Sequence, residues 1–191
     1  MYNQCKAKLS SSLYAIRQSR QLLTSDHLLM LYNTLIYPYL TYGVLLWGST
    51  HQTYIHYIVT IQKKAVRAIA HAPYNAHTHH LFQRFKILKF QDIYRFYLGK
   101  YMYQQVNYLL PEPLLNKYYQ CQDIHPYKTR QANQLHKQSR RTVKASNSFI
   151  NKGLDHWNRL PNDLKDINCQ KYFNKKHKIH LHSMSNHQSL A

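Results

Sequence analysis

Apolar residues recur at every third or fourth position along most of the chain. In one long run they form a single stripe, at Leu28, Leu31, Leu35, Tyr39, Tyr42 and Leu46. This is the spacing of a helix with one face on a protein core. The same pattern predicts helices near residues 4–22, 26–47, 52–71, 77–85, 91–109, 146–158 and 168–181.

Residues that begin, bend or end helices fit several of these boundaries. Ser25 can cap the second helix, Pro38 is expected to kink it, and Pro73 ends the third. The chain has only 4 glycines, too few for many tight hairpins. The predicted fold is therefore mostly α: an irregular helical bundle with a basic extended connector and a small C-terminal helical unit.

The apolar periodicity fades between residues 122 and 144, where Lys and Arg accumulate. Such a stretch is typical of an extended segment between folded units. We therefore expect a helical body at 1–122, a basic connector at 123–145 and a small helical unit at 146–191.

A membrane span has to be considered because no Asp, Glu, Lys or Arg occurs between Asp26 and Lys63. Leu28–Trp47 is about as long as a bilayer requires. It also contains Asn33, Pro38 and four tyrosines, and its apolar residues follow one face. We therefore expect a buried helix and no membrane partner.

Charge sets the strongest functional expectation. The 191 residues carry 26 Lys and Arg against 7 Asp and Glu, a formal net charge of +19. An excess of this size repels itself unless an anionic partner screens it, and nucleic acid is the commonest such partner. The alternative is a basic surface that only keeps the chain soluble.

The helix expected at 52–71 separates its residues by chemistry. One face is predicted to be core and holds Ile55, Ile58, Val59, Gln62, Ala65, Val66 and Ile69. The other carries His56, Thr60, Lys63, Lys64, Arg67 and His71, a cationic stripe that could follow a phosphate backbone. An ordinary solvated face is the competing interpretation.

Cysteine and histidine do not suggest a metal centre or a cofactor. The 3 cysteines are far apart in the sequence and form no CxxC pair, which favours a reducing, intracellular setting without choosing nucleus or cytoplasm. Histidines cluster at His71–His80 and at His177, His180 and His182, without the Cys or carboxylate neighbours usual for zinc. We interpret both clusters as surface histidines.

Catalysis is not expected of this chain alone. Metal-dependent phosphoryl transfer needs at least two converging carboxylates, and most of the few acids are scattered along the sequence. Asp163 and Asp166 are close together but follow Pro161, where acids usually stabilise a helix N-terminus.

Several sequence segments occur in the same order along the chain as in one protein family. They are LYNTLIYPYLTYGVLLWG, IQKKAVRAIAHAPYNAHTHHLFQRFKILKFQDIY, LLPEPL, HPYKTR and WNRLP. Together they resemble the region downstream of the polymerase core in LINE-type, non-LTR retrotransposon reverse transcriptases, over about residues 6–173. The resemblance implies a thumb and connector that grip template and primer. The palm of that family carries a Tyr-x-Asp-Asp-like motif, and this chain has no Asp-Asp pair.

We therefore expect a fragment of an RNA-directed DNA polymerase whose partners are RNA or an RNA/DNA hybrid and the missing N-terminal polymerase domain. The candidate contacts to the nucleic-acid backbone are Lys63, Lys64, Arg67, Lys128, Arg130, Arg140 and Arg141. In WNRLP, the expectation is structural: Trp157 is buried, and Leu160 and Pro161 end a helix. The alternatives are a stand-alone basic RNA-binding or structural protein, and a protein of membrane surfaces.

Overall fold

Helices make up 69% of the chain in the computed structural model, and no strand occurs among the residues that it describes. Those residues are 2–50, 52–115, 118–124, 132–139 and 141–187. The prediction of a mostly α, irregular helical bundle is confirmed.

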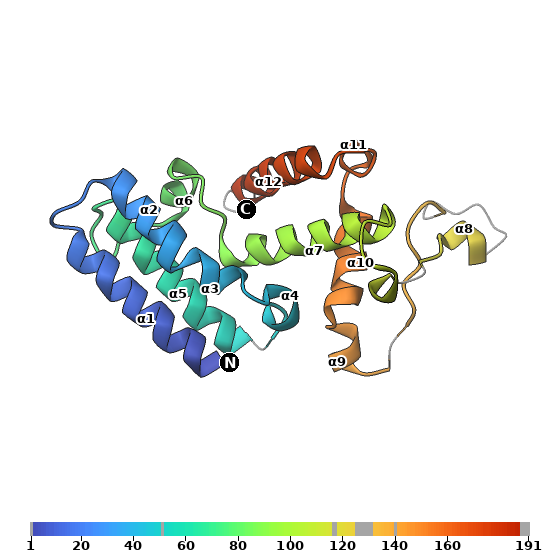
Figure 1. The fold of residues 1–191 in the computed structure, drawn as a ribbon, viewed down its shortest axis with the longest axis horizontal. Coiled ribbons are helices and arrows are strands. Elements are labelled where there is room, and N and C mark those ends of the chain that lie inside the picture. Colours follow the sequence, from blue (N-terminus) through green and yellow to red (C-terminus); the bar gives the residue numbers. More distant parts are fainter. Residues whose placement is uncertain (1, 51, 116–117, 125–131, 140, 188–191) are drawn as a thin grey trace. The chain divides into compact units, whose positions relative to one another are not determined.

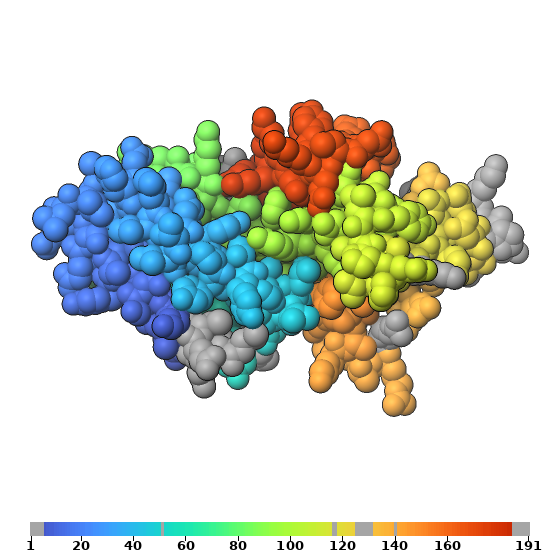
Figure 2. Space-filling model, in the orientation of Figure 1, coloured from blue at the N-terminus to red at the C-terminus, as the bar shows by residue number. Residues whose placement is uncertain are grey.

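The first compact unit comprises Met1–Tyr94. Its two long helices, α1 (Tyr2–Ser19) and α5 (Gln52–Ile69), pack against each other, and α2 (Ser25–Leu35) packs on both (Figure 1). Short helices α3 (Tyr37–Thr41), α4 (Val44–Trp47) and α6 (His79–Arg84) complete it. In the space-filling view the side chains of these helices close the spaces that the ribbon leaves open (Figure 2). The fully buried apolar residues include Ile16, Leu28, Tyr32, Ile36, Leu40, Val66 and Ile69.

The single kinked helix predicted at 26–47 is wrong: the segment forms three short helices. Pro38 stands in the first turn of α3, where its missing N–H costs no hydrogen bond. The second break follows Tyr42, whose backbone is extended, and Gly43, whose φ of 60° lies in the left-handed region. The indole Nε1 of Trp47 donates a hydrogen bond of 2.7 Å to the carbonyl of Tyr42 and so satisfies an acceptor at this break.

The second compact unit comprises Arg95–Ala191. It contains most of α7 (Phe90–Val106), the 3-10 turn η1 (Glu112–Leu114), and helices α8 (Cys121–Ile124), α9 (Val143–Ser146), α10 (Phe149–Arg159), α11 (Asn162–Lys165) and α12 (Gln170–His187) (Figure 1). Its core gathers Met102, Tyr103, Leu154, Trp157, Leu160, Leu164 and Phe173. The proposed domain boundaries at 122 and 145 stay a prediction.

Across the described part of the chain, every helix is too short or too polar to cross a bilayer. The charge-free stretch after Asp26 ends up in the short helices α2, α3 and α4 and the first part of α5.

Candidate nucleic-acid interface

Helix α5 has two chemically distinct sides. Ile55, Ile58, Ala65, Val66 and Ile69 are buried as predicted, together with Ile61 and Ala68. Val59, which was predicted to be core, is only half-buried. Lys63 and Lys64 are exposed, and so is His56, about two turns earlier in the helix.

The buried side of α5 is fixed by Gln62, which is 1% exposed. Its Nε2 donates hydrogen bonds to the hydroxyl of Tyr32 and the carbonyl of Leu88, each at 2.9 Å. Its Oε1 accepts one from the N–H of Phe90, the first residue of α7, also at 2.9 Å. One side chain therefore joins α2, α5 and the start of α7. This fixes how α5 is rotated and keeps Lys63 and Lys64 turned away from the core.

Arg67 differs from the two lysines because it also has a structural task. It is half-buried, and its Nε donates a hydrogen bond of 2.8 Å to the carbonyl of Ala76. This bond ties the loop after α5 back to the helix. Of the three candidates on α5, Lys63 and Lys64 are therefore the two that are exposed to solvent and have no structural role in the described part of the chain.

The C-terminal end of α5 is closed by a Schellman motif. The N–H of Ala72 donates to the carbonyl of Arg67 at 3.0 Å, and that of His71 donates to Ala68 at 3.2 Å. His71 occupies the left-handed position of this motif, with φ of 52°, where glycine is usual. Its exposed imidazole therefore projects at the end of the cationic stripe.

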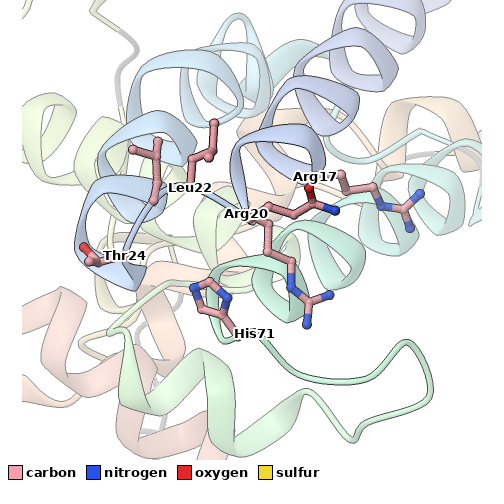
Figure 3. A pocket seen from close by; sticks show the side chains of 7 residues that line it. Arg17, Arg20, Leu22, Thr24 and His71 are labelled. Atoms are coloured by element: carbon pink, nitrogen blue, oxygen red, sulfur yellow. The ribbon is translucent and has the colours of Figure 1, made fainter.

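An open pocket of about 750 Å³ lies beside this helix end and has a cationic lining (Figure 3). It is lined by Arg17, Arg20, Gln21, Leu22, Leu23, Thr24 and His71. Arg17 and Arg20 are not among the predicted site residues, because more than 30 residues separate them from the α5 stripe. The crossing of α1 and α5 brings them to His71, and a helical wheel of either segment alone cannot show this.

Of the connector residues that we predicted to contact nucleic acid, the structure describes only one. Lys128, Arg130 and Arg140 lie outside the described residues, whereas Arg141 is exposed. Lys137 is held by Asp155 of α10, with Nζ 2.7 Å from Oδ2. Backbone hydrogen bonds pair Cys121 with Gln134 and Tyr119 with His136, so part of this segment folds back on itself.

The WNRLP motif closes α10 inside the second unit. Trp157 and Leu160 are each 4% exposed, α10 ends at Arg159, and Pro161 precedes α11. Asn158 forms two hydrogen bonds to the backbone of Leu135: its Oδ1 accepts from the N–H at 3.0 Å and its Nδ2 donates to the carbonyl at 2.9 Å. The sequence did not predict this role for Asn158.

The interpretation of both histidine clusters as surface residues is wrong for His177, which is 0% exposed. It lies four residues from Phe173 and four from Leu181, and all three face the core along one side of α12. His71, His77 and His80 of the other cluster are exposed. No group of three metal-binding side chains gathers among the residues searched, which are the described ones.

Burial changes the protonation of the C-terminal histidines. Nε2 of His156 lies 3.0 Å from Nε2 of His177. Loss of solvent, followed by the neighbouring positive charge of Arg95, lowers the pKa of His156 to about 4. Burial, followed by the proximity of His156, lowers the pKa of His177 to about 3. Both imidazoles are therefore neutral at pH 7 and add nothing to the cationic surface.

Comparison with models of protein families, with curated proteins and with solved structures finds no match to this chain.

Proposed function

We propose that this chain is a non-catalytic, nucleic-acid-gripping region of a retrotransposon RNA-directed DNA polymerase, corresponding to the thumb and the connector that follows it. The ordered phrases that resemble LINE-type enzymes support this origin. The charge supports the partner, because residues 1–94 alone contain ten Lys and Arg against two Asp.

The observation that carries the proposal is the sidedness of α5. A fully hydrogen-bonded Gln62 fixes the buried side, and Lys63 and Lys64 stand exposed on the other. Neighbouring lysines on one helix can contact successive phosphates of a strand, and each contact releases counterions. Such contacts hold a strand without reading its bases.

The test is the salt dependence of binding to a labelled RNA/DNA hybrid, measured by fluorescence anisotropy between 50 and 200 mM salt. The variant is Lys63→Gln with Lys64→Gln, because Gln keeps helix propensity close to that of Lys. Arg67 is left in place, since replacing it would also free the loop at Ala76.

We expect the slope of log affinity against log salt to flatten by roughly 1.4 to 1.8, because each phosphate contact contributes roughly 0.7 to 0.9. Unrelated sequences should lose affinity equally. The control removes the same charge from the exposed Lys175 and Lys178 of α12. An unchanged slope in a folded Lys63/Lys64 variant, or an equal change in the control, would contradict the proposed role of α5.

A further inference from the structure

The pocket at the ends of α1 and α5 has the chemistry of an anion site. Arg17 lies in the last turn of α1, Arg20 in the turn that follows, and His71 at the end of α5 (Figure 3). No acidic residue lines the pocket. In the described part of the chain, neither arginine forms a hydrogen bond or an ion pair with a protein acceptor.

Arginines that have no acceptor differ from those of a structural network. Arg67, one turn before His71, binds the carbonyl of Ala76, whereas the donors of Arg17 and Arg20 remain open to a ligand. A guanidinium presents a planar set of donors that matches two oxygens of a phosphate. Two such groups beside one pocket fit a phosphate better than a single lysine would.

The backbone around His71 holds the pocket in shape. The Schellman motif fixes His71, a residue other than glycine, in the left-handed region, and this conformation is held only because the surrounding structure determines it. Tethering of the following loop by Arg67 also restrains this corner. His71 therefore keeps its place in the lining, on the side of Arg20 (Figure 3), instead of moving with a free loop.

The rim of the pocket adds an apolar surface. Leu22 is 87% exposed, and Leu23 and Thr24 line the wall beside it. An apolar rim next to arginines can pack against the sugar or base attached to a bound phosphate. This combination favours a phosphate ester over a bare inorganic ion.

We propose that the pocket of Arg17, Arg20 and His71 binds a phosphate group of a nucleic-acid strand. The site lies at the end of the α5 stripe and rests on the proposed function for the identity of the ligand. The phosphate could be internal to the strand or at its 5′ end, and the chemistry of the pocket is the same for both.

The experiment uses the full chain and three labelled oligonucleotides of one sequence: one with a 5′-phosphate, one with a 5′-hydroxyl, and one with a 5′-hydroxyl and twice the length. The variant is Arg17→Gln with Arg20→Gln. Arg17→Lys with Arg20→Lys keeps the charge, and the Lys175/Lys178 variant removes the same charge elsewhere. Circular dichroism checks that each variant folds.

If the pocket binds one phosphate of the strand, the Gln variant should flatten the salt slope by roughly 0.7 to 0.9, since the contact to that phosphate is lost. The Lys variant should keep most of the slope. A change confined to the 5′-phosphorylated strand assigns a terminal phosphate, and an equal change for all three assigns an internal one. In addition, inorganic phosphate should shift the imidazole NMR signals of His71 in the unaltered chain and not in the Gln variant.

The pocket proposal is overturned if the Gln variant binds all three strands with unchanged slope, or if the Lys175/Lys178 variant loses as much. In that case the unaltered chain still binds and the proposed function stands. If the unaltered chain binds no strand at all, the proposed function fails, and the nucleic-acid assignment of the pocket fails with it.

Discussion

Asn158 holds the backbone of Leu135 with both ends of its amide, accepting from the N–H and donating to the carbonyl. The two residues are 23 positions apart, one on α10 and the other in the segment that precedes α9. A single side chain thus satisfies both backbone groups of a residue that has no helix to satisfy them. The asparagine of WNRLP therefore has a structural role of its own, next to that of the buried Trp157.

Replacing Asn158 with Ala should destabilise the second unit by about 1–3 kcal/mol, because two backbone groups lose their partners. Asn158→Asp should be no better, since a carboxylate oxygen would face the carbonyl of Leu135. Urea unfolding measures the loss, and faster hydrogen exchange at the N–H of Leu135 would locate it. Asn33→Ala, at an exposed position of α2, is the control. A variant as stable as the parent would contradict this role of Asn158 and would show that the ion pair of Lys137 and Asp155 is enough to hold this segment on α10.

Periodicity predicted the long helices well and their interruptions poorly. The helices near 52–71 and 91–109 were placed within a few residues of α5 and α7, because one continuous apolar stripe determines each. The stretch 26–47 has an equally good stripe, yet it breaks at Ile36 and again at Tyr42 and Gly43. Break points depend on where freed backbone groups find partners, such as Nε1 of Trp47, and those partners come from the folded structure.

The residues of the candidate site also fall into two groups: those that helical periodicity predicts and those whose roles depend on the folded structure. A helical wheel correctly predicts that Lys63 and Lys64 are exposed, because α5 is a regular helix whose apolar residues lie on one face. The hydrogen bond of Arg67 to Ala76 depends on the geometry of the loop after α5, and the presence of Arg17 and His71 in one pocket depends on how α1 packs against α5. His177 was misjudged because histidine is polar by residue type, whereas its spacing from Phe173 and Leu181 places it on the apolar side of α12.

Gln62 should be the most costly polar residue to replace in the first unit. In Gln62→Leu, the N–H of Phe90 and the carbonyl of Leu88 would be buried without a partner, so we expect a loss of about 2–4 kcal/mol. Tyr32→Phe removes one hydrogen bond of the same group and should cost about 1 kcal/mol. Urea unfolding of both variants, with Gln18→Leu at an exposed position of α1 as control, gives the ranking. Equal stability of the Gln62 and Gln18 variants would contradict it.

The two glycines inside helices of the second unit should respond differently to alanine. A Cβ on Gly99 would meet the buried ring of His177, with Nδ1 at 2.8 Å, whereas one on Gly153 would meet the flexible side chain of Met102 at 3.0 Å. Alanine is favoured over glycine in a helix by about 1 kcal/mol. Gly153→Ala should therefore be close to neutral.

Gly99→Ala should lose about 1–3 kcal/mol, as overpacked core substitutions do. Thermal unfolding of the two variants is the measurement. Adding His177→Ala to Gly99→Ala supplies a further check, because the second substitution should then cost less than it does in the parent chain. Equal melting temperatures for the two single alanine variants would contradict the close contact between Gly99 and His177.

The pair formed by the buried His177 and the half-buried His156 should make the second unit sensitive to acid. Nδ1 of His177 is buried and has no hydrogen-bond partner, so the favourable arrangement leaves Nδ1 unprotonated. Nε2–H of His177 then donates to Nε2 of His156. A second proton on either ring would break this bond or place a charge beside Phe96 and Phe173, which both contact the ring of His177. Arg95, Arg159 and His180 add further repulsion.

The direction follows from the two pKa values, about 4 for His156 and about 3 for His177, against an ordinary value of 6.5. Because the unfolded chain takes up protons first, the stability that comes from neutral imidazoles is fully present above about pH 6.5 and is lost as the pH falls toward 3. Each imidazole contributes at most about 1.4 kcal/mol per pH unit in this window.

Urea unfolding at pH 7.5, 6 and 5 should show a steep decline of the free energy of unfolding in the parent chain. His177→Leu should flatten that decline whatever its own stability, whereas His80→Gln, at an exposed position, should leave it unchanged. An equal decline in parent and His177→Leu would place the acid sensitivity elsewhere, in the general repulsion of a chain whose net charge is already +19.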